Sequence, residues 1–315
     1  MAVAPDHGVG VTPTFFGANP AHVPRGHAHA GFRLIGAEED AAFTLSGSLE
    51  GGIRSQAVIA NRSLGDIVSG PGRKLALRGF EGVPLARLNE AQRGGVMRIL
   101  ELLDSDAIKR DPKPIVGFSD LTAFSAWCVK SAGVRTIHGP MVNQIGRVPG
   151  EELAWLFALL EDPSPPGVLV DERPRVGARG GGTVEGRMVG GNLEMVTRLL
   201  GTPWAFDLGA SVLVLEDVGE RPYRIDRALT QLKLAGALDG VRAVCLGDFL
   251  RSDEEDGMPP TAAEVLAERL TAFDIPAVGG LPVGHGDHNL AFPLGGRCAV
   301  DLAVGRVVLE EGAVE

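Results

Sequence analysis

The sequence predicts an α/β protein, with an N-terminal parallel-sheet domain that carries a nucleophile at a strand-helix turn and a C-terminal mixed α/β domain. Two patterns predict this architecture. From residue 93 onward, short apolar runs typical of buried strands alternate with segments whose apolar residues recur at helical spacing. A proline-rich segment, Glu161–Gly167, then interrupts the pattern. We therefore expect domains at 1–160 and 181–315, joined by a linker at 161–180.

Composition places the chain among globular proteins. Its 315 residues are 44% hydrophobic and 22% charged, which excludes a mainly disordered or collagen-like chain. The net charge of -10 offers no basic surface of the kind that phosphate-backbone binding requires, so we expect no nucleic-acid partner. The N-terminus lacks a signal-peptide pattern, and no window approaches ~18 consecutive apolar residues. These features predict a cytoplasmic protein with no membrane partner.

Three cysteines, Cys128, Cys245 and Cys298, each lie in an apolar run. This context is typical of small buried side chains in a reducing compartment. Their spacing matches neither a disulfide framework nor a zinc signature, so the cysteines predict no covalent cross-link and no metal site.

The elements of the N-terminal half become readable only after a long featureless stretch. Residues 1 to about 90 show no sustained helical or strand periodicity. After them, the pattern predicts a helix at 96–103, a strand at 114–118 and a helix at 121–132. An amphipathic helix at 151–160 ends where the prolines begin.

The C-terminal half continues the alternation of apolar strands with helices that stop at glycine or proline. Strands are predicted at 183–189, 211–215 and 241–246, helices at 192–200, 225–234 and 261–273, and a terminal hairpin at 298–302 and 306–309. In an open sheet of this type, ligands collect at the carboxyl ends of the strands. Polar residues that follow the strands are therefore the candidates for a functional site.

The first candidate is Ser119, which with Asp120 lies at the predicted junction of a strand and a helix. A serine on a tight strand-to-helix turn projects its hydroxyl away from the sheet, where the amides that open the helix can stabilise an oxyanion. Ser and Asp also lead the residues that cap helix N-termini. Taken alone, the pair favours the capping interpretation.

The second candidate is Glu216, the first of two acids that directly follow the apolar run 211–215. An acid that leaves a buried strand at its carboxyl end is well placed for a site. The alternative is the start of a polar loop or a helix cap. Asp226, which precedes the helical run 227–234, is predicted to be such a cap.

The third candidate is His285, which glycines flank on both sides. They leave the imidazole reachable, as a general base must be. A metal site would need His288 on the same helical face, and the glycines argue against that helix. Three further histidines lie in irregular sequence and are interpreted as loop or structural residues: His27, His29 and His138.

Seven segments together resemble the serine L,D-carboxypeptidases, also called muramoyltetrapeptide carboxypeptidases, whose relatives include the microcin C immunity peptidases. The similarity covers about residues 93 to 305, and the segment around Glu216 is highly specific. The similar segments are 93–100, 114–122, 138–141, 190–193, 199–204, 215–227 and 284–286.

The resemblance implies that Ser119 is the nucleophile, His285 its general base and Glu216 the carboxylate that orients the imidazole. Such a triad needs neither a metal nor a cofactor, because the base activates the hydroxyl and the acid stabilises the imidazolium. An oxyanion hole of backbone amides is implied as well, and its expected members are Asp120, Gly94 and Gly95.

The family's substrate is a peptide bond between an L-centre and a terminal D-alanine, which is cut through an acyl-enzyme. The resemblance therefore implies a muropeptide tetrapeptide as the substrate, murein recycling as the role and a homodimer as the assembly. A carboxypeptidase must also bind the free carboxylate, which the guanidinium fork of arginine matches. Arg93 and Arg224 are the candidates for this contact.

Two other functions stay open. A peptidase of the microcin C immunity type, which cleaves a peptidyl-nucleotide amide, would share the triad and differ in the loops that bind the leaving group. A non-catalytic muropeptide-binding protein would keep the fold after losing its N-terminal core. A glycine-rich nucleotide-binding module is disfavoured, because the glycines at 180–182 precede a predicted strand and do not open a helix.

The N-terminal part departs from the family pattern. Family members carry an apolar strand directly before the glycine loop, whereas residues 86–92 are too polar for a central parallel strand. Val96 also stands where an aromatic residue is usual. Either this part of the chain has diverged, or a compensated frame slip has altered the translation of residues 1–92.

Overall fold

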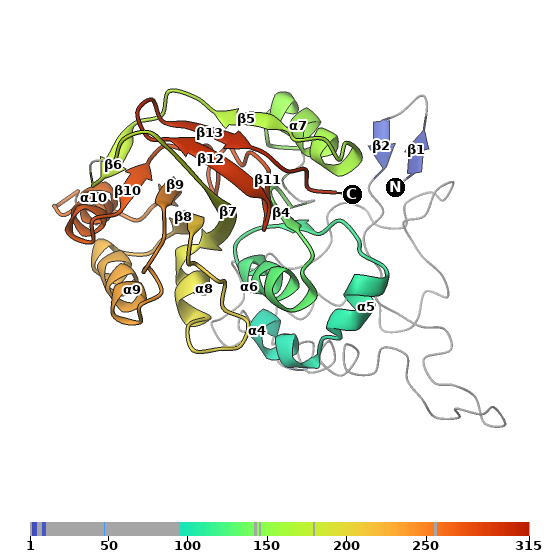
Figure 1. Cartoon of the computed structure of the whole chain (residues 1–315), viewed down its shortest axis with the longest axis horizontal. Coiled ribbons are helices and arrows are strands. Elements are labelled where there is room, and N and C mark those ends of the chain that lie inside the picture. Colours follow the sequence, from blue (N-terminus) through green and yellow to red (C-terminus); the bar gives the residue numbers. More distant parts are fainter. Residues whose placement is uncertain are drawn as a thin grey trace. The chain divides into compact units, whose positions relative to one another are not determined.

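Figure 1 shows the chain, of which the computed structural model describes residues 2–4, 8–10, 47, 95–141, 144, 146–178, 180–254 and 257–314. The chain divides into two compact units, residues 1–103 and 104–315. The chain contains both helices and strands, and the strands pair in parallel and in antiparallel orientation. The predicted α/β class is therefore confirmed. Ser119, Glu216 and His285 all belong to the second unit.

The first unit contains a short hairpin and a short helix among its described residues. β1 (Ala2–Ala4) pairs antiparallel with β2 (Gly8–Gly10). α4 (Gly95–Ile99) continues into a 3₁₀ turn, η2 (Leu100–Leu102). The helix predicted at 96–103 is thereby confirmed, with its last turn wound more tightly.

A small sheet in the second unit carries the nucleophile segment. β3 (Val116–Gly117) pairs parallel with β4 (Thr136–His138), which pairs antiparallel with β11 (Phe292–Leu294). After β3 the chain turns into α6 (Leu121–Trp127), which continues as a π-helical segment, η3 (Cys128–Ala132). The strand and the helix predicted to flank the candidate nucleophile are confirmed.

An eight-stranded mixed sheet forms the rest of the second unit. Its four central strands are parallel, which is the arrangement that alternating strands and helices produce, and antiparallel strands extend both edges. In sheet order the strands are β5 (Gly167–Val170), β13 (Arg306–Leu309), β12 (Arg297–Asp301), β7 (Thr183–Asn192), β8 (Ser211–Val218), β9 (Ala243–Leu250), β10 (Pro276–Val278) and β6 (Arg175–Gly177).

The helices of the second unit include three that lie side by side against this sheet, α8, α9 and α10 (Figure 1). Helix α7 packs instead near β11 of the small sheet. The bounds of the remaining helices are α5 (Ser105–Arg110), α7 (Gly150–Glu161), α8 (Leu193–Arg198), α9 (Pro222–Leu234) and α10 (Ala262–Ala272). Every helix and strand predicted between residues 151 and 309 is thus present, including the terminal hairpin of β12 and β13.

The core follows directly from the apolar runs of the sequence. Residues 212–216 of β8 are completely buried, because neighbouring elements cover both faces of this central strand. The three cysteines are buried with free thiols, as predicted, and burial raises the pKa of Cys128 and of Cys245 to about 12. Within the described residues, no helix has both the length and the hydropathy to cross a membrane.

Two details differ from the prediction. The segment 161–180, expected to be a linker, contributes β5 and β6 to opposite edges of the large sheet. Its prolines end a helix as expected, but the strands after them are held by pairing with distant segments. Asp226 does not cap a helix, because α9 begins four residues earlier at Pro222 and Asp226 forms an ion pair with Arg269 at 2.6 Å.

Candidate active site

Ser119 lies in the turn between β3 and α6. Its φ of 60° is in the left-handed region, which costs a residue with a side chain ~1–3 kcal/mol and is typical of functional turns. Asp120 occupies the N-cap position of α6 but makes no side-chain capping bond, and the Ser119 hydroxyl bonds outside the helix. The capping interpretation of this pair is therefore wrong, and the turn presents the hydroxyl to another part of the chain.

Glu216 lies near the carboxyl end of β8, where the strand pairing is irregular. Leu215 pairs with Leu246 but Asp217 pairs with Phe249, so β9 carries one extra residue opposite Glu216. Such bulges re-aim side chains at the ends of strands. The Glu216 side chain is completely buried, and its Oε2 faces His285.

His285 follows Gly284, whose φ of 127° suits glycine. The imidazole Nδ1 lies 2.7 Å from Glu216 Oε2, and Nε2 lies 3.1 Å from Ser119 Oγ. The ring of Phe118 packs on the imidazole with a centroid distance of 4.7 Å. The structure therefore brings together three side chains that are separated in sequence by 166 and 69 positions.

This arrangement can perform proton transfer coupled to nucleophilic attack. With the Nδ1 proton donated to Glu216, Nε2 is free to accept the proton of the Ser119 hydroxyl. The buried carboxylate then stabilises the imidazolium that forms, because few water molecules compete for it. The side chain of His285 is 17% exposed, so part of the imidazole is accessible from solvent.

A second buried network lies beside the acid and was not predicted as a unit. Asp217 accepts hydrogen bonds from the Asn192 side chain at 3.0 Å and from the Glu194 amide at 3.1 Å. Asn192 donates its own amide to Thr122 Oγ1 of α6 at 3.1 Å. The strand that carries the acid is thereby joined to the helix that follows the nucleophile. The signals of it in the sequence were the two acids after one apolar run and the similar segment 190–193, which did not indicate that they meet.

His138, interpreted as a loop or structural residue, is a buried residue of β4, so the structural alternative is confirmed. Its ring stacks on Phe292 at 4.7 Å and packs against Phe118, which in turn contacts His285. Burial lowers the pKa of His138 to about 3, so this ring stays neutral and supports the site by packing.

The residues predicted to form the oxyanion hole and to bind the substrate carboxylate are not among the three side chains that the structure brings together. Arg93 and Gly94 lie outside the described residues, and Gly95 is the first residue of α4 in the other unit. Arg224 lies on α9, where it contacts Glu220 at 3.4 Å and the Tyr223 hydroxyl at 3.2 Å. These contacts raise the pKa of its guanidinium. Its role, and those of the amides, stay predictions.

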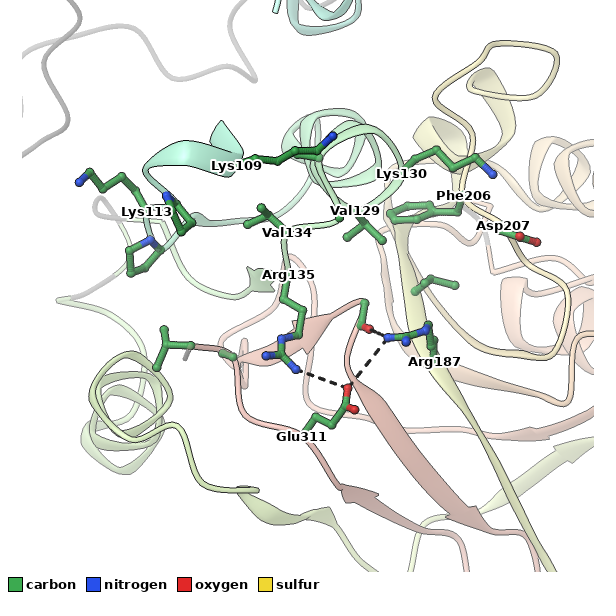
Figure 2. A pocket seen from close by; sticks show the side chains of 18 residues that line it. Lys109, Lys113, Val129, Lys130, Val134, Arg135, Arg187, Phe206, Asp207 and Glu311 are labelled. Carbon is green, nitrogen blue, oxygen red and sulfur yellow. Dashed lines mark hydrogen bonds and ion pairs between the residues drawn. The ribbon is translucent and has the colours of Figure 1, made fainter. Parts of the chain in front are cut away.

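A cavity of about 810 Å³ in the second unit is separate from the three side chains (Figure 2). Lys113 and Arg135, which precede β3 and β4, line it, so it lies at the amino ends of these strands. Arg135 and Arg187 both form ion pairs with Glu311, at 3.4 and 4.0 Å. Since Ser119 follows the carboxyl end of β3, this cavity is not the candidate active site.

A hydrogen-bonded Ser-His-Glu set of this geometry is typical of serine hydrolases. Residues 91–139 match the family model of the LD-carboxypeptidase N-terminal domain, and residues 185–300 match that of the LD-carboxypeptidase C-terminal domain. The probable murein peptide carboxypeptidase of Bacillus subtilis is 31% identical over 235 residues, which are 70% of this chain and 70% of that protein. The chain belongs to the LD-carboxypeptidase family.

Two further proteins extend the comparison. The microcin self-immunity protein MccF of Escherichia coli is 31% identical over 231 residues, 64% of this chain and 67% of that protein. The crystal structure of muramoyltetrapeptide carboxypeptidase from Oxalobacter formigenes superposes with a TM-score of 0.59 at 30% identity, covering 70% of this chain and 75% of that chain. The chain spans about two thirds of the length of several curated relatives that it matches.

The N-terminal part has a match of a different kind. Residues 1–111 match a family model described as a protein of unknown function, DUF3500. The LD-carboxypeptidase match begins only at residue 91. Most of the segment 86–92, which departs from the carboxypeptidase pattern, therefore lies before that match, whereas Val96 lies within it.

Proposed function

We propose that the chain is a serine-type L,D-carboxypeptidase that releases the terminal D-alanine from a muropeptide tetrapeptide in the cytoplasm. The observation that carries the proposal is the continuous hydrogen-bonded path from Ser119 through His285 to Glu216. Its relatives named murein peptide carboxypeptidase and muramoyltetrapeptide carboxypeptidase support the substrate class. Murein recycling and the homodimer that the resemblance implies stay predictions.

The reaction would proceed through an acyl-enzyme. Ser119 Oγ attacks the carbonyl carbon of the peptide bond while His285 takes the hydroxyl proton, and the same proton then passes to the amine of the leaving D-alanine. A water molecule, deprotonated in turn by His285, hydrolyses the ester and restores the serine. Glu216 keeps the imidazole in the tautomer that both steps require.

The test is incubation of the purified chain with murein tetrapeptide, following release of D-alanine. The wild type should release it, and Ser119→Ala should lower kcat by on the order of 10³-fold or more, because the nucleophile is gone. Equal release by both proteins would refute the proposed mechanism.

A second candidate function rests on the similarity to MccF. A peptidase of that type would use the same three side chains on a peptidyl-nucleotide amide. Running the same assay with such an amide distinguishes the two, because the preferred substrate is the one with the higher kcat/KM.

A further inference from the structure

We propose that α7 positions the general base, with Glu152 and Trp155 as the residues through which it acts. This inference rests on the proposed function, because it concerns the orientation of His285. Neither residue touches the three catalytic candidates directly. Both bind the backbone segment that follows His285, so they are positioning residues and not catalytic ones.

The segment around His285 is closed on itself by internal hydrogen bonds. The Asn289 side chain is completely buried, and its Oδ1 accepts the Gly284 amide at 3.2 Å. The Leu290 amide donates to the Pro282 carbonyl at 2.8 Å. These two bonds join the two ends of the short loop 282–290, which contains His285. A displacement of residues 288–290 would therefore displace His285 as well.

Helix α7 contacts the C-terminal end of this loop through two of its residues, which lie one helical turn apart. The Glu152 carboxylate accepts the Asn289 amide at 2.9 Å with one oxygen and faces His288 Nδ1 at 2.6 Å with the other. The Trp155 indole donates to the Ala291 carbonyl at 2.7 Å. Residues three positions apart lie on one face of a helix, so both contacts come from the same side.

The position of Glu152 on its helix argues for a specific role. Its side chain is only 8% exposed, and it shares the buried stripe of α7 with Leu156 and Leu159. These leucines pack in a small core that includes Ala291. Burying a carboxylate among apolar residues is costly unless hydrogen bonds compensate, and here the compensating donors belong to the loop.

The loop is held on its other side by the large sheet. The Asp248 amide donates to the Val283 carbonyl at 2.8 Å, and the Asp248 carboxylate accepts the Gly286 amide. The loop that carries His285 is thus held by β9 on one side and by α7 on the other, in addition to the contacts of the imidazole with Glu216 and Ser119. A serine nucleophile depends on a correctly placed base, since a misplacement of about 1 Å can cost about 100-fold in rate.

The experiment measures the reaction of Ser119 with a fluorophosphonate probe, which needs no peptide substrate. The Ser119 oxygen forms a bond to phosphorus, fluoride leaves, and the hydroxyl proton passes to His285. Glu152→Leu should slow this reaction by about 10- to 100-fold. Glu152→Gln, which keeps an acceptor for the Asn289 amide, should react at close to the wild-type rate.

The exposed neighbour on the same helical turn provides the matched control, and Glu151→Leu should leave the rate unchanged. On tetrapeptide, Glu152→Leu should lower kcat and leave KM unaltered, which a general loss of folded protein would not produce in active-site-titrated samples. Should this variant fail to fold, Trp155→Phe removes one loop contact alone. This variant should also lower kcat and leave KM unaltered, with a smaller decrease in kcat.

The outcomes separate this inference from the proposed function. A wild type that does not react at Ser119 would refute the catalytic triad and the positioning role with it. A reactive wild type that is matched in rate by Glu152→Leu, or by a folded Trp155→Phe when the first variant is unfolded, would refute the positioning role alone. A Glu152→Gln variant as slow as Glu152→Leu would also contradict it.

Discussion

Glu216, the proposed orienting acid, lies in an unfavourable environment. Its side chain is completely buried, and Oε1 has no hydrogen-bond partner in the part of the chain that the structure describes. An ionised oxygen without a partner costs more than a neutral amide in the same place. The residue therefore contributes to orientation of His285 at some expense of stability, as functional residues often do.

Replacing Glu216 by glutamine separates these two effects. We expect Glu216→Gln to lower kcat by about 10²–10⁴-fold, because the neutral amide neither fixes the tautomer nor stabilises the imidazolium. The midpoint of thermal unfolding should stay equal or rise, because no charge remains buried. Steady-state kinetics and a melting curve check both parts, and a variant with full activity or a clearly lower midpoint would contradict them.

The sequence singled out three candidate residues that the structure brings into hydrogen-bonding distance, and their catalytic roles stay predictions. Ser119, Glu216 and His285 each stand at a place where a strand pattern ends, and the resemblance then assigned roles to them. Glu152 was missed, although an acid spaced four and seven positions before Leu156 and Leu159 marks a buried carboxylate. That signal says only that the residue needs a partner, and it cannot say which one.

At the scale of elements, local signals fixed the helices more completely than the strands. α10 has a full capping box: the Thr261 hydroxyl accepts the Glu264 amide at 3.2 Å, and the Glu264 carboxylate accepts the Thr261 amide at 2.8 Å. Both partners are three residues apart in sequence, so the start of this helix needs no tertiary information.

This cap gives a quantitative expectation. Thr261→Ala should lower the free energy of unfolding by about 1 kcal/mol, because the Glu264 amide loses its acceptor. Thr261→Ser keeps the hydroxyl and serves as the control, with a much smaller loss. Urea unfolding measures both, and equal losses in the two variants would show that the methyl group and not the hydrogen bond matters.

The short strands behaved differently. β4, β5, β6 and β11 have three or four residues each, and the sequence around them carries no turn or hairpin signal that distinguishes such a short strand from a loop. β4 exists because Ile137 pairs with Val116 on one side and Pro293 on the other, at sequence distances that no local rule covers. The expected linker became two strands for the same reason.

At the scale of the whole molecule, two buried groups give opposing contributions to the pH dependence of stability. Desolvation lowers the pKa of His138 to about 3, below its unfolded value, so its contribution to stability grows as the pH rises toward 6.5. Desolvation raises the pKa of Asp217 from 3.8 to about 7. The unfolded chain releases this proton first, so the contribution of Asp217 falls as the pH rises from about 4 to 7.

Asp217→Asn isolates the second contribution, because His138 is common to both proteins. The free energy of unfolding of the variant, minus that of the wild type, should become more positive from pH 4 to pH 7, by as much as ~4 kcal/mol. At pH 4 the free energy of unfolding itself is expected to be lower in the variant than in the wild type, since the amide cannot accept every hydrogen bond that Asp217 accepts. Denaturant titrations at three pH values measure the trend, and a difference that is constant with pH would contradict it.

The sequence by itself determined the α/β class, the long strands and every helix except α5 between residues 95 and 309, and the identity of the three candidate catalytic residues. Each of these depends on signals within about fifteen residues: periodicity, turn chemistry, or a motif. Only the tertiary structure decided that Ser119 turns toward His285 and does not cap α6, that Glu216 faces the imidazole, and that α7 contacts the loop that carries His285. These features depend on contacts between segments more than sixty positions apart, and the local sequence does not indicate which distant segments will meet.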